Sequence, residues 1–176
     1  RQEPAPCANA KPLVDHLMKV AHWQVRDVAS WCGNMMLHKT HKDFPSDVVL
    51  LMSACGATLS VLRAGDSQPR TVGFMEFAEA EYDAAEVVLS MRLPLLRGDD
   101  VCFDTFKVMG RHANSHPLVN AAFCLHLVPV ATSRGRYGRR QQQQQRSQQQ
   151  RTVASATVLV GNMQPGLRRC TKTETA

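Results

Sequence analysis

The chain has 176 residues, of which 44% are hydrophobic, and a formal net charge of +6. This length and hydrophobic content suffice for a buried core and exclude a wholly disordered chain. The charge does not predict a nucleic-acid-binding surface, because without one acid-free segment the formal charge would be zero. The arginines of that segment are Arg134, Arg136, Arg139, Arg140, Arg146 and Arg151.

The six cysteines are scattered, with no Cys-x-x-Cys pair. No leader of charged and then apolar residues precedes them, and no apolar run approaches the roughly 20 residues that a membrane-spanning helix needs. This pattern predicts a reducing compartment, so we expect a cytoplasmic protein that does not span a membrane. The start at Arg1, without methionine, predicts a processed chain or a fragment.

The N-terminal part predicts helices. PLVDHLMKVAHW, residues 12–23, has the spacing of an amphipathic helix with Pro12 in its first turn. Its apolar stripe consists of Leu13, Leu17, Val20 and Ala21. VRDVASWCGN, residues 25–34, follows as a tight turn of small residues. Ser46 is expected to cap a short apolar helix that ends at Gly56, with a strand after it.

The C-terminal part predicts strands. EVVLSMRLP, CFDTFKVMG and LVNAAFCLHLVPV are bounded by Gly, Pro and Asp, and the later ones follow one another with little helical signal between them. An antiparallel meander is therefore expected. The Arg/Gln-rich residues 133–151 are of low complexity and predict a loop, which lies inside a hairpin because TVASATVLVGNM resumes the strand pattern. RNA binding by this loop is disfavoured, because only Tyr137 offers a stacking ring.

Five collinear segments resemble the FAD-binding domain of xanthine dehydrogenases, aldehyde oxidases and related molybdenum hydroxylases. QVRDVASWCGN matches the family's Q-[VI]-R-N-x-[AG]-S-x-G-G-N pattern. SDVVLLMSACGATLSV, VVLSMRLP, FKVMGRH and CTKTE resemble the family's later segments in the same order. The resemblance spans about residues 13 to 174, apart from the glutamine tract.

The resemblance implies a set of FAD-binding residues. A flavin must be approached by backbone, and small residues permit this. Cys32 stands where family members carry a second glycine, and its Cβ disfavours a positive φ by about 1 kcal/mol or more. Lys107 matches a lysine beside the flavin ring, where a cation stabilises the reduced, anionic flavin. The complete implied set is Ser30, Cys32, Gly33, Asn34, Asp47, Val88 and Lys107.

Several of these residues also fit plainer roles. The turn at 30–34 could simply join a helix to the next element. Asp47 could cap the helix that it helps to start, and Asp43 is a rival for its place in the family pattern. Lys107 could be an exposed strand residue. The histidine pairs of HKTH and RHANSH do not predict zinc, which needs four ligands, and we expect them in solvated loops.

The resemblance implies an α+β fold. A disordered or truncated leader of residues 1–12 precedes the second lobe of a two-lobed FAD-binding domain, residues 13–97. Residues 98–176 form part of a C-terminal α+β domain with an antiparallel sheet. The family's first lobe has no counterpart before Pro12. The implied function is electron transfer from iron-sulfur clusters through FAD to NAD or dioxygen. Molybdopterin and 2Fe-2S clusters would be held by partner domains or subunits, and a homo-oligomer is compatible with the sequence. A truncated, non-catalytic paralogue with a structural or assembly role is the alternative.

Overall fold

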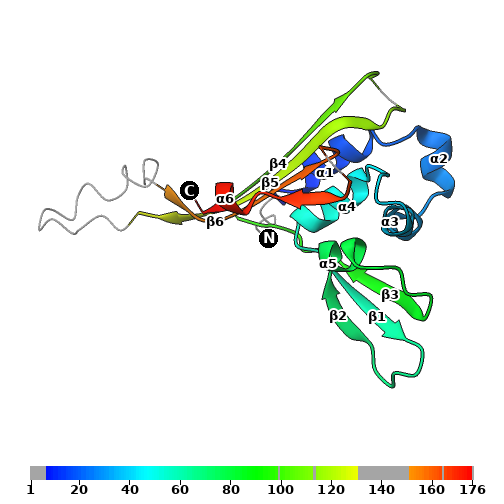
Figure 1. Ribbon diagram of the computed structural model, residues 1–176. Coiled ribbons are helices and arrows are strands. Elements are labelled where there is room, and N and C mark those ends of the chain that lie inside the picture. The colour runs from blue at the N-terminus through cyan, green and yellow to red at the C-terminus, as the bar shows by residue number, and fades with distance from the viewer. Residues whose placement is uncertain (1–6, 99, 113, 131–150, 164, 176) are drawn as a thin grey trace, which may run out of the picture.

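The computed structural model describes residues 7–98, 100–112, 114–130, 151–163 and 165–175. A long antiparallel sheet carries helices on one face, and a smaller sheet extends from the helical side (Figure 1). Within the described residues, no helix is long and apolar enough to cross a membrane. The fold is therefore the expected α+β arrangement of helices and antiparallel sheets.

The larger sheet has the strand order β4-β5-β6-β7, and every neighbouring pair is antiparallel. This confirms the expected meander. The strands are β4 (Val101–Met109), β5 (Pro117–Pro129), β6 (Arg151–Gly161) and β7 (Leu167–Arg169). The pairing of β5 with β6 reaches Pro129 opposite Arg151, so the two strands on either side of the glutamine tract pair as predicted. The tract itself lies outside the described residues.

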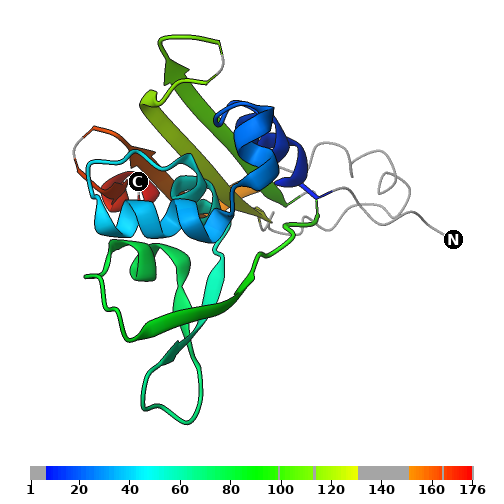
Figure 2. The same ribbon diagram turned by 90° about the vertical axis from the view of Figure 1, so that its right-hand side faces the viewer.

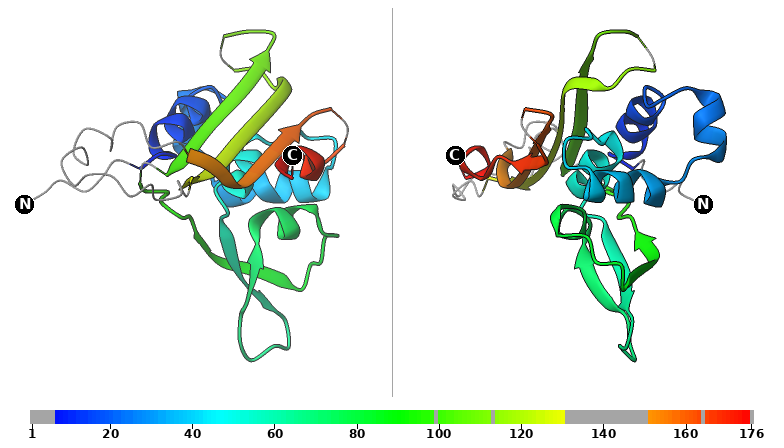
Figure 3. Two further views of the ribbon diagram at one scale, coloured as in Figure 1. Left: turned by 90° about the vertical axis from the view of Figure 1, so that its left-hand side faces the viewer. Right: turned by 45° about the vertical axis from the view of Figure 1, so that its right-hand side comes forward.

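Four helices of the N-terminal half lie on one side of this sheet, and two of them pack against it. They are α1 (Ala10–Leu17), α2 (Trp23–Val28), α3 (Trp31–Thr40) and α4 (Asp47–Ala54). α1 contacts β4, and α4 contacts β5 and β6. The short helix α6 (Thr171–Glu174) lies on the other face, against β6 (Figure 3). α4 is apolar on all sides because it is enclosed between the sheet, α3 and α5.

The smaller sheet has the order β2-β1-β3 and is also antiparallel. Its strands are β1 (Thr58–Arg63), β2 (Arg70–Gly73) and β3 (Glu86–Arg92), and α5 (Phe74–Glu79) joins β2 to β3. Figure 2 shows α3 lying across the top of α5. Trp31 of α3 packs on Phe74 of α5 with 6.1 Å between the ring centroids, and this contact joins the two helices.

One hydrophobic cluster joins the two parts of the chain. It contains Leu51 of α4 and Leu59 of β1, and it also contains Leu159 of β6. The expected division near Gly98 into residues 13–97 and 98–176 stays a proposal. Packing across that point is continuous in the described residues.

The hairpin between β5 and β6 leads to a prediction about the glutamine tract. We expect that deleting residues 139–150 and joining the ends changes the free energy of unfolding by less than about 1 kcal/mol, since a doubling of loop length costs only about 0.6 kcal/mol. Urea unfolding of the two forms measures this. A loss of several kcal/mol would show that the tract contributes to the fold.

Candidate functional site

Residues 25–28 of the sequence motif are the end of α2, and residues 31–34 are the first turn of α3, so the motif joins two helices and is not a tight turn. Ser30 is the N-cap of α3, and its Oγ accepts a hydrogen bond of 3.0 Å from the backbone N–H of Gly33. Cys32, Gly33 and Asn34 are therefore helical. None of the three has a positive φ. The expectation that a Cβ at position 32 strains the backbone was wrong, because the motif supplies a capping serine and an ordinary first turn.

This correction changes what a glycine at position 32 should do. Cys32 is half-buried against the hydrophobic cluster. Cys32→Gly is expected to lower the free energy of unfolding by about 1 kcal/mol, because glycine has a poor helix propensity and loses the packing contact. Urea unfolding checks this. A variant that is more stable than the parent would contradict the helical assignment.

The connection between α1 and α2 is held by Arg26. Its guanidinium Nη1 donates to the carbonyls of Met18, Val20 and Ala21 at 3.3, 2.7 and 3.2 Å. The helix predicted over 12–23 ends early, at Leu17, and Ala21 turns the chain with φ +52°. These backbone turns bring residues 20 and 21 beside β4, where they line a pocket.

That pocket, which we call the Lys107 pocket, has a volume of about 600 Å³. It lies between the α1–α2 connection, α3, the segment before α4, and the β4–β5 hairpin. Its lining consists of Val20, Ala21, Val25, Asn34, Leu37, Phe44, Pro45, Asp47, Lys107, Arg111, Asn114, Ser115 and His116. Three of the seven sequence-predicted residues, Asn34, Asp47 and Lys107, therefore meet in one cavity.

Asp47 and Lys107 form a buried ion pair. The Lys107 Nζ donates to Asp47 Oδ2 at 2.7 Å. The side chain of Lys107 is 1% exposed and that of Asp47 is 4% exposed. Lys107 is thus no exposed strand residue. The capping role considered for Asp47 belongs to Ser46, whose Oγ accepts from the Val49 N–H at 3.0 Å.

Burial alone would raise the pKa of the Asp47 carboxyl, because it disfavours the charged form. Hydrogen bonds from His16, Lys107 and Asn120, together with the charge of Lys107, outweigh this effect and lower the pKa below its ordinary value. Asp47 is therefore ionised at neutral pH.

The side chain of Asn34 is held by Ser46, the N-cap residue of α4. Ser46 Oγ donates to Asn34 Oδ1 at 2.6 Å, so the amide nitrogen of Asn34 is left as a donor. Among the described residues this nitrogen has no hydrogen-bond acceptor. It remains available to a ligand in the Lys107 pocket.

The remaining predicted residues lie elsewhere. Ser30, Cys32 and Gly33 are in the first turn of α3 and do not line the pocket. Val88 is in β3 of the small sheet, opposite Val61, and is half-buried against the core. Its proposed contact with a flavin ring stays a prediction.

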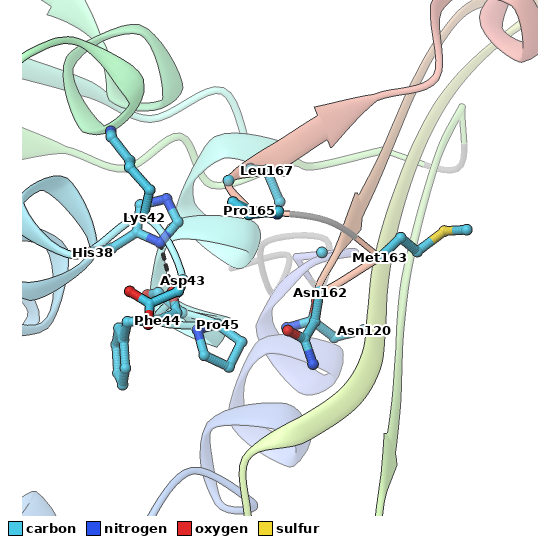
Figure 4. Close-up of a pocket in the computed structure, with 13 residues that line it drawn as sticks. His38, Lys42, Asp43, Phe44, Pro45, Asn120, Asn162, Met163, Pro165 and Leu167 are labelled. Carbon is cyan, nitrogen blue, oxygen red and sulfur yellow. Dashed lines mark hydrogen bonds between the residues drawn. The ribbon is translucent and has the colours of Figure 1, made fainter.

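Asp43, the rival of Asp47, lines a different cavity. This Gly161 pocket has a volume of about 220 Å³ and lies between the end of α3 and the β6–β7 connection (Figure 4). Its wall includes His38, whose Nδ1 is 2.8 Å from the Phe44 carbonyl oxygen and whose Nε2 is 2.9 Å from Glu79 Oε1. His38 is therefore a buried helix residue, and the expected solvated loop was wrong for it.

Sequence reasoning missed four residues of the site, and three of them had a signal in the sequence. His16 follows Leu13 at helical spacing on an apolar face, and Asn120 interrupts an apolar strand; both are the kind of buried polar residue that requires a partner. Arg111 lies in the quoted FKVMGRH segment, four residues after Lys107. His116 packs edge-on against Phe44 at 5.6 Å between the ring centroids.

Comparison with known proteins identifies the family. Residues 3–96, more than half of the chain, match the family model "FAD binding domain in molybdopterin dehydrogenase". An indole-3-acetaldehyde oxidase of Zea mays is 35% identical over 115 residues, which are 64% of this chain and 8% of that protein. An abscisic-aldehyde oxidase of Arabidopsis thaliana is 30% identical over 121 residues, 64% of this chain and 9% of that protein.

Solved structures have the same fold. The carbon monoxide dehydrogenase of Hydrogenophaga pseudoflava superposes with a TM-score of 0.64 at 18% identity, over 92% of this chain and 48% of that chain. Quinoline 2-oxidoreductase of Pseudomonas putida 86 gives 0.63 at 18% identity, over 94% and 49%. The chain thus spans about half the length of these structures and less than a tenth of the two plant oxidases. It belongs to the family of FAD-binding domains of the molybdopterin dehydrogenases.

Proposed function

We propose that this chain forms one side of an FAD site in a molybdenum hydroxylase assembly. In that assembly the flavin would receive electrons from iron-sulfur clusters and pass them to NAD or dioxygen. One observation carries the proposal: a single cavity gathers Asn34, Asp47 and Lys107 from three separate segments. Its volume of about 600 Å³ lies within the range of ordinary cofactor pockets.

The donors around the Lys107 pocket suit a flavin nucleotide. FAD offers hydrogen-bond acceptors in its ring carbonyls, ring nitrogens and phosphates, and the pocket offers the Asn34 amide and the Arg111 guanidinium. Arg111 donates only to the Asn114 carbonyl at 2.8 Å among the described residues. Asp47 would not repel the cofactor strongly, because Lys107 compensates its charge. The residues present therefore fit the group.

The chain's own contribution would be position and electrostatics. When bound, FAD supplies the electron-transfer chemistry. Arg111 would favour negative charge on the ring or phosphates, Lys107 and Asn34 would orient acceptors as hydrogen-bond donors, and the apolar Val25 and Leu37 would exclude water from one side. Neither the substrate of a parent enzyme nor its acceptor is chosen by these residues.

The assembly is part of the same proposal. Iron-sulfur and molybdenum-binding domains or subunits would be its partners, a homo-oligomer is compatible with it, and the cytoplasm would be its compartment. The plant aldehyde oxidases that the chain resembles are more than ten times longer than the matched segment, which supports a function inside a larger enzyme.

Chemical-shift mapping tests the proposal directly. FAD is titrated into the ¹⁵N-labelled polypeptide of residues 1–176, with FMN and AMP as comparisons for the two halves of the cofactor. We expect the largest shifts at residues 20–25, Asn34, Lys107 and Arg111. Shifts confined to other surfaces, or none at millimolar FAD, would refute the proposal and favour a non-catalytic structural role.

A further inference from the structure

The Asp47 carboxylate is fully engaged by three side chains from different elements. Its Oδ1 accepts from His16 Nε2 of α1 at 3.1 Å and from Asn120 Nδ2 of β5 at 2.6 Å. Its Oδ2 accepts from Lys107 of β4 at 2.7 Å. Asp47, His16 and Asn120 are only 5%, 2% and 1% exposed. A carboxylate held so completely has little capacity left for a ligand.

Lys107 is fixed by two acceptors at once. Its Nζ donates to Asp47 Oδ2 and also to the Lys19 carbonyl oxygen at 3.1 Å. The second bond ties β4 to the residues that follow α1. An ammonium has three donors, so one N–H remains for a group in the pocket.

The side chain of Asn120 is held in one orientation by Asp47 on one side and by the space beside Gly161 on the other. Its Nδ2 must face the carboxylate, so its Oδ1 faces away and has no hydrogen-bond partner within the described residues. A Cβ on Gly161 would lie 2.2 Å from that oxygen. Glycine at 161, which pairs with Asn120 across β5 and β6, therefore leaves the space that Asn120 needs. Asn120 and Gly161 line the Gly161 pocket, whereas Asp47 and Lys107 line the Lys107 pocket.

We propose that His16 and Asn120 are positioning residues for the Lys107 pocket. They hold the Asp47 carboxylate, the carboxylate holds the Lys107 ammonium at the pocket wall, and Asp47 acts on a bound flavin through Lys107 without touching it. This rests on the proposed function only for its last step. Gly161 belongs to the same line of contacts, because it sets the position of Asn120.

The positioning is tested without cofactor. Hydrogen exchange of the Lys107 side-chain ammonium is followed by ¹⁵N NMR in His16→Leu, Asn120→Leu and Gly161→Ala, with the exposed His22→Leu as the matched control. We expect exchange about tenfold faster in the first three, as for the loss of one hydrogen bond to a charged group, and partial rescue in His16→Gln. Rates within twofold of the parent in all three would overturn the proposal.

Global destabilisation is separated by a reference amide. The backbone N–H of Val61 lies in the small sheet, where its residue is fully buried, and it reports unfolding of the whole molecule. Its exchange should change less than that of the Lys107 ammonium. An equal acceleration of both would mean that the residues only stabilise the fold, and would also overturn the proposal. Gly161→Ala retains the side chains of His16, Asp47, Lys107 and Asn120. It therefore keeps the test valid if a histidine or asparagine variant does not fold.

The action through Lys107 is tested by a double-mutant cycle in FAD binding. We expect Asp47→Asn to change the FAD dissociation constant about fivefold or more in the parent, and less than twofold in the Lys107→Met background. Additive effects would make Asp47 a direct ligand and overturn this step. If no form binds FAD, the parent included, the proposed function fails, while ammonium exchange still decides the positioning.

Discussion

Lys107→Met is expected to lower the free energy of unfolding by about 3 to 5 kcal/mol at pH 7. Methionine fills much of the same space, so the packing loss is small. The cost comes from leaving the Asp47 carboxylate charged and buried without its cation, which is the situation in which one member of a buried pair has been removed. The remaining donors, His16 and Asn120, satisfy only one of the two oxygens.

The matched control is Lys11→Met. Lys11 pairs with Asp15 on α1, but the two side chains are 85% and 55% exposed, and exposed pairs contribute little. Urea unfolding should find this variant close to the parent. If Lys107→Met were equally harmless, the buried pair would not contribute as its geometry indicates.

The difference in the free energy of unfolding between the parent and Lys107→Met should decrease as the pH falls. Because the folded-state pKa of Asp47 lies below its unfolded value, ionised Asp47 contributes stability above pH about 4, and this is lost as pH falls through the folded-state pKa. In Lys107→Met that depression is reduced. The stability gap should therefore be largest at neutral pH and narrow below pH about 4. A gap that widens on acidification would contradict this assignment.

The sequence predicts best where local signals and packing agree. Ser46 caps α4 as its position suggests, and Gly56 follows the helix with φ +71°, a conformation that favours glycine. The strand alternation of CFDTFKVMG places Phe103 inward and Phe106 outward, and the two are 7% and 60% exposed. Such patterns depend on residues that are close in the chain.

The sequence failed where partners are distant in the chain. Nothing near Asp47 indicates that His16, Lys107 and Asn120 will surround it, because these contacts span 31 to 73 residues. The small residues of segment 30–34 suit either a tight turn or a capped helix start, so the sequence alone does not distinguish the two. The Ser30 cap and the packing of Trp31 on Phe74 decide between them.

A polypeptide of residues 1–176 is expected not to retain stoichiometric FAD through gel filtration. The chain corresponds to about half of each solved relative, and the polar groups that it gathers at the Lys107 pocket are few. The N–H groups at the start of α3 lie outside that pocket, so they do not add to the same set of contacts.

The expected loss of affinity follows from the hydrogen bonds to the diphosphate that the described residues of the Lys107 pocket would not supply. A charge-assisted hydrogen bond to a diphosphate contributes about 1.5 to 3 kcal/mol, and each 1.4 kcal/mol is about tenfold in affinity. Three absent contacts would therefore weaken binding by roughly three to six orders of magnitude. A nanomolar site would become a micromolar to millimolar one, which loses its ligand during gel filtration but still produces shifts in an NMR titration.

The exposed apolar side chains around the Lys107 pocket also predict weak retention of FAD. Val25 and Leu37 line it and are 45% and 42% exposed, so much of the apolar surface that a buried cofactor would cover remains open to water. Purification without added flavin, followed by absorbance near 450 nm and calorimetric titration, measures retention. Addition of excess FAD before gel filtration controls for cofactor lost during expression. A yellow, one-to-one complex after that column would refute the prediction and would mean that residues of this chain, or of a second copy, bind the diphosphate from outside the Lys107 pocket.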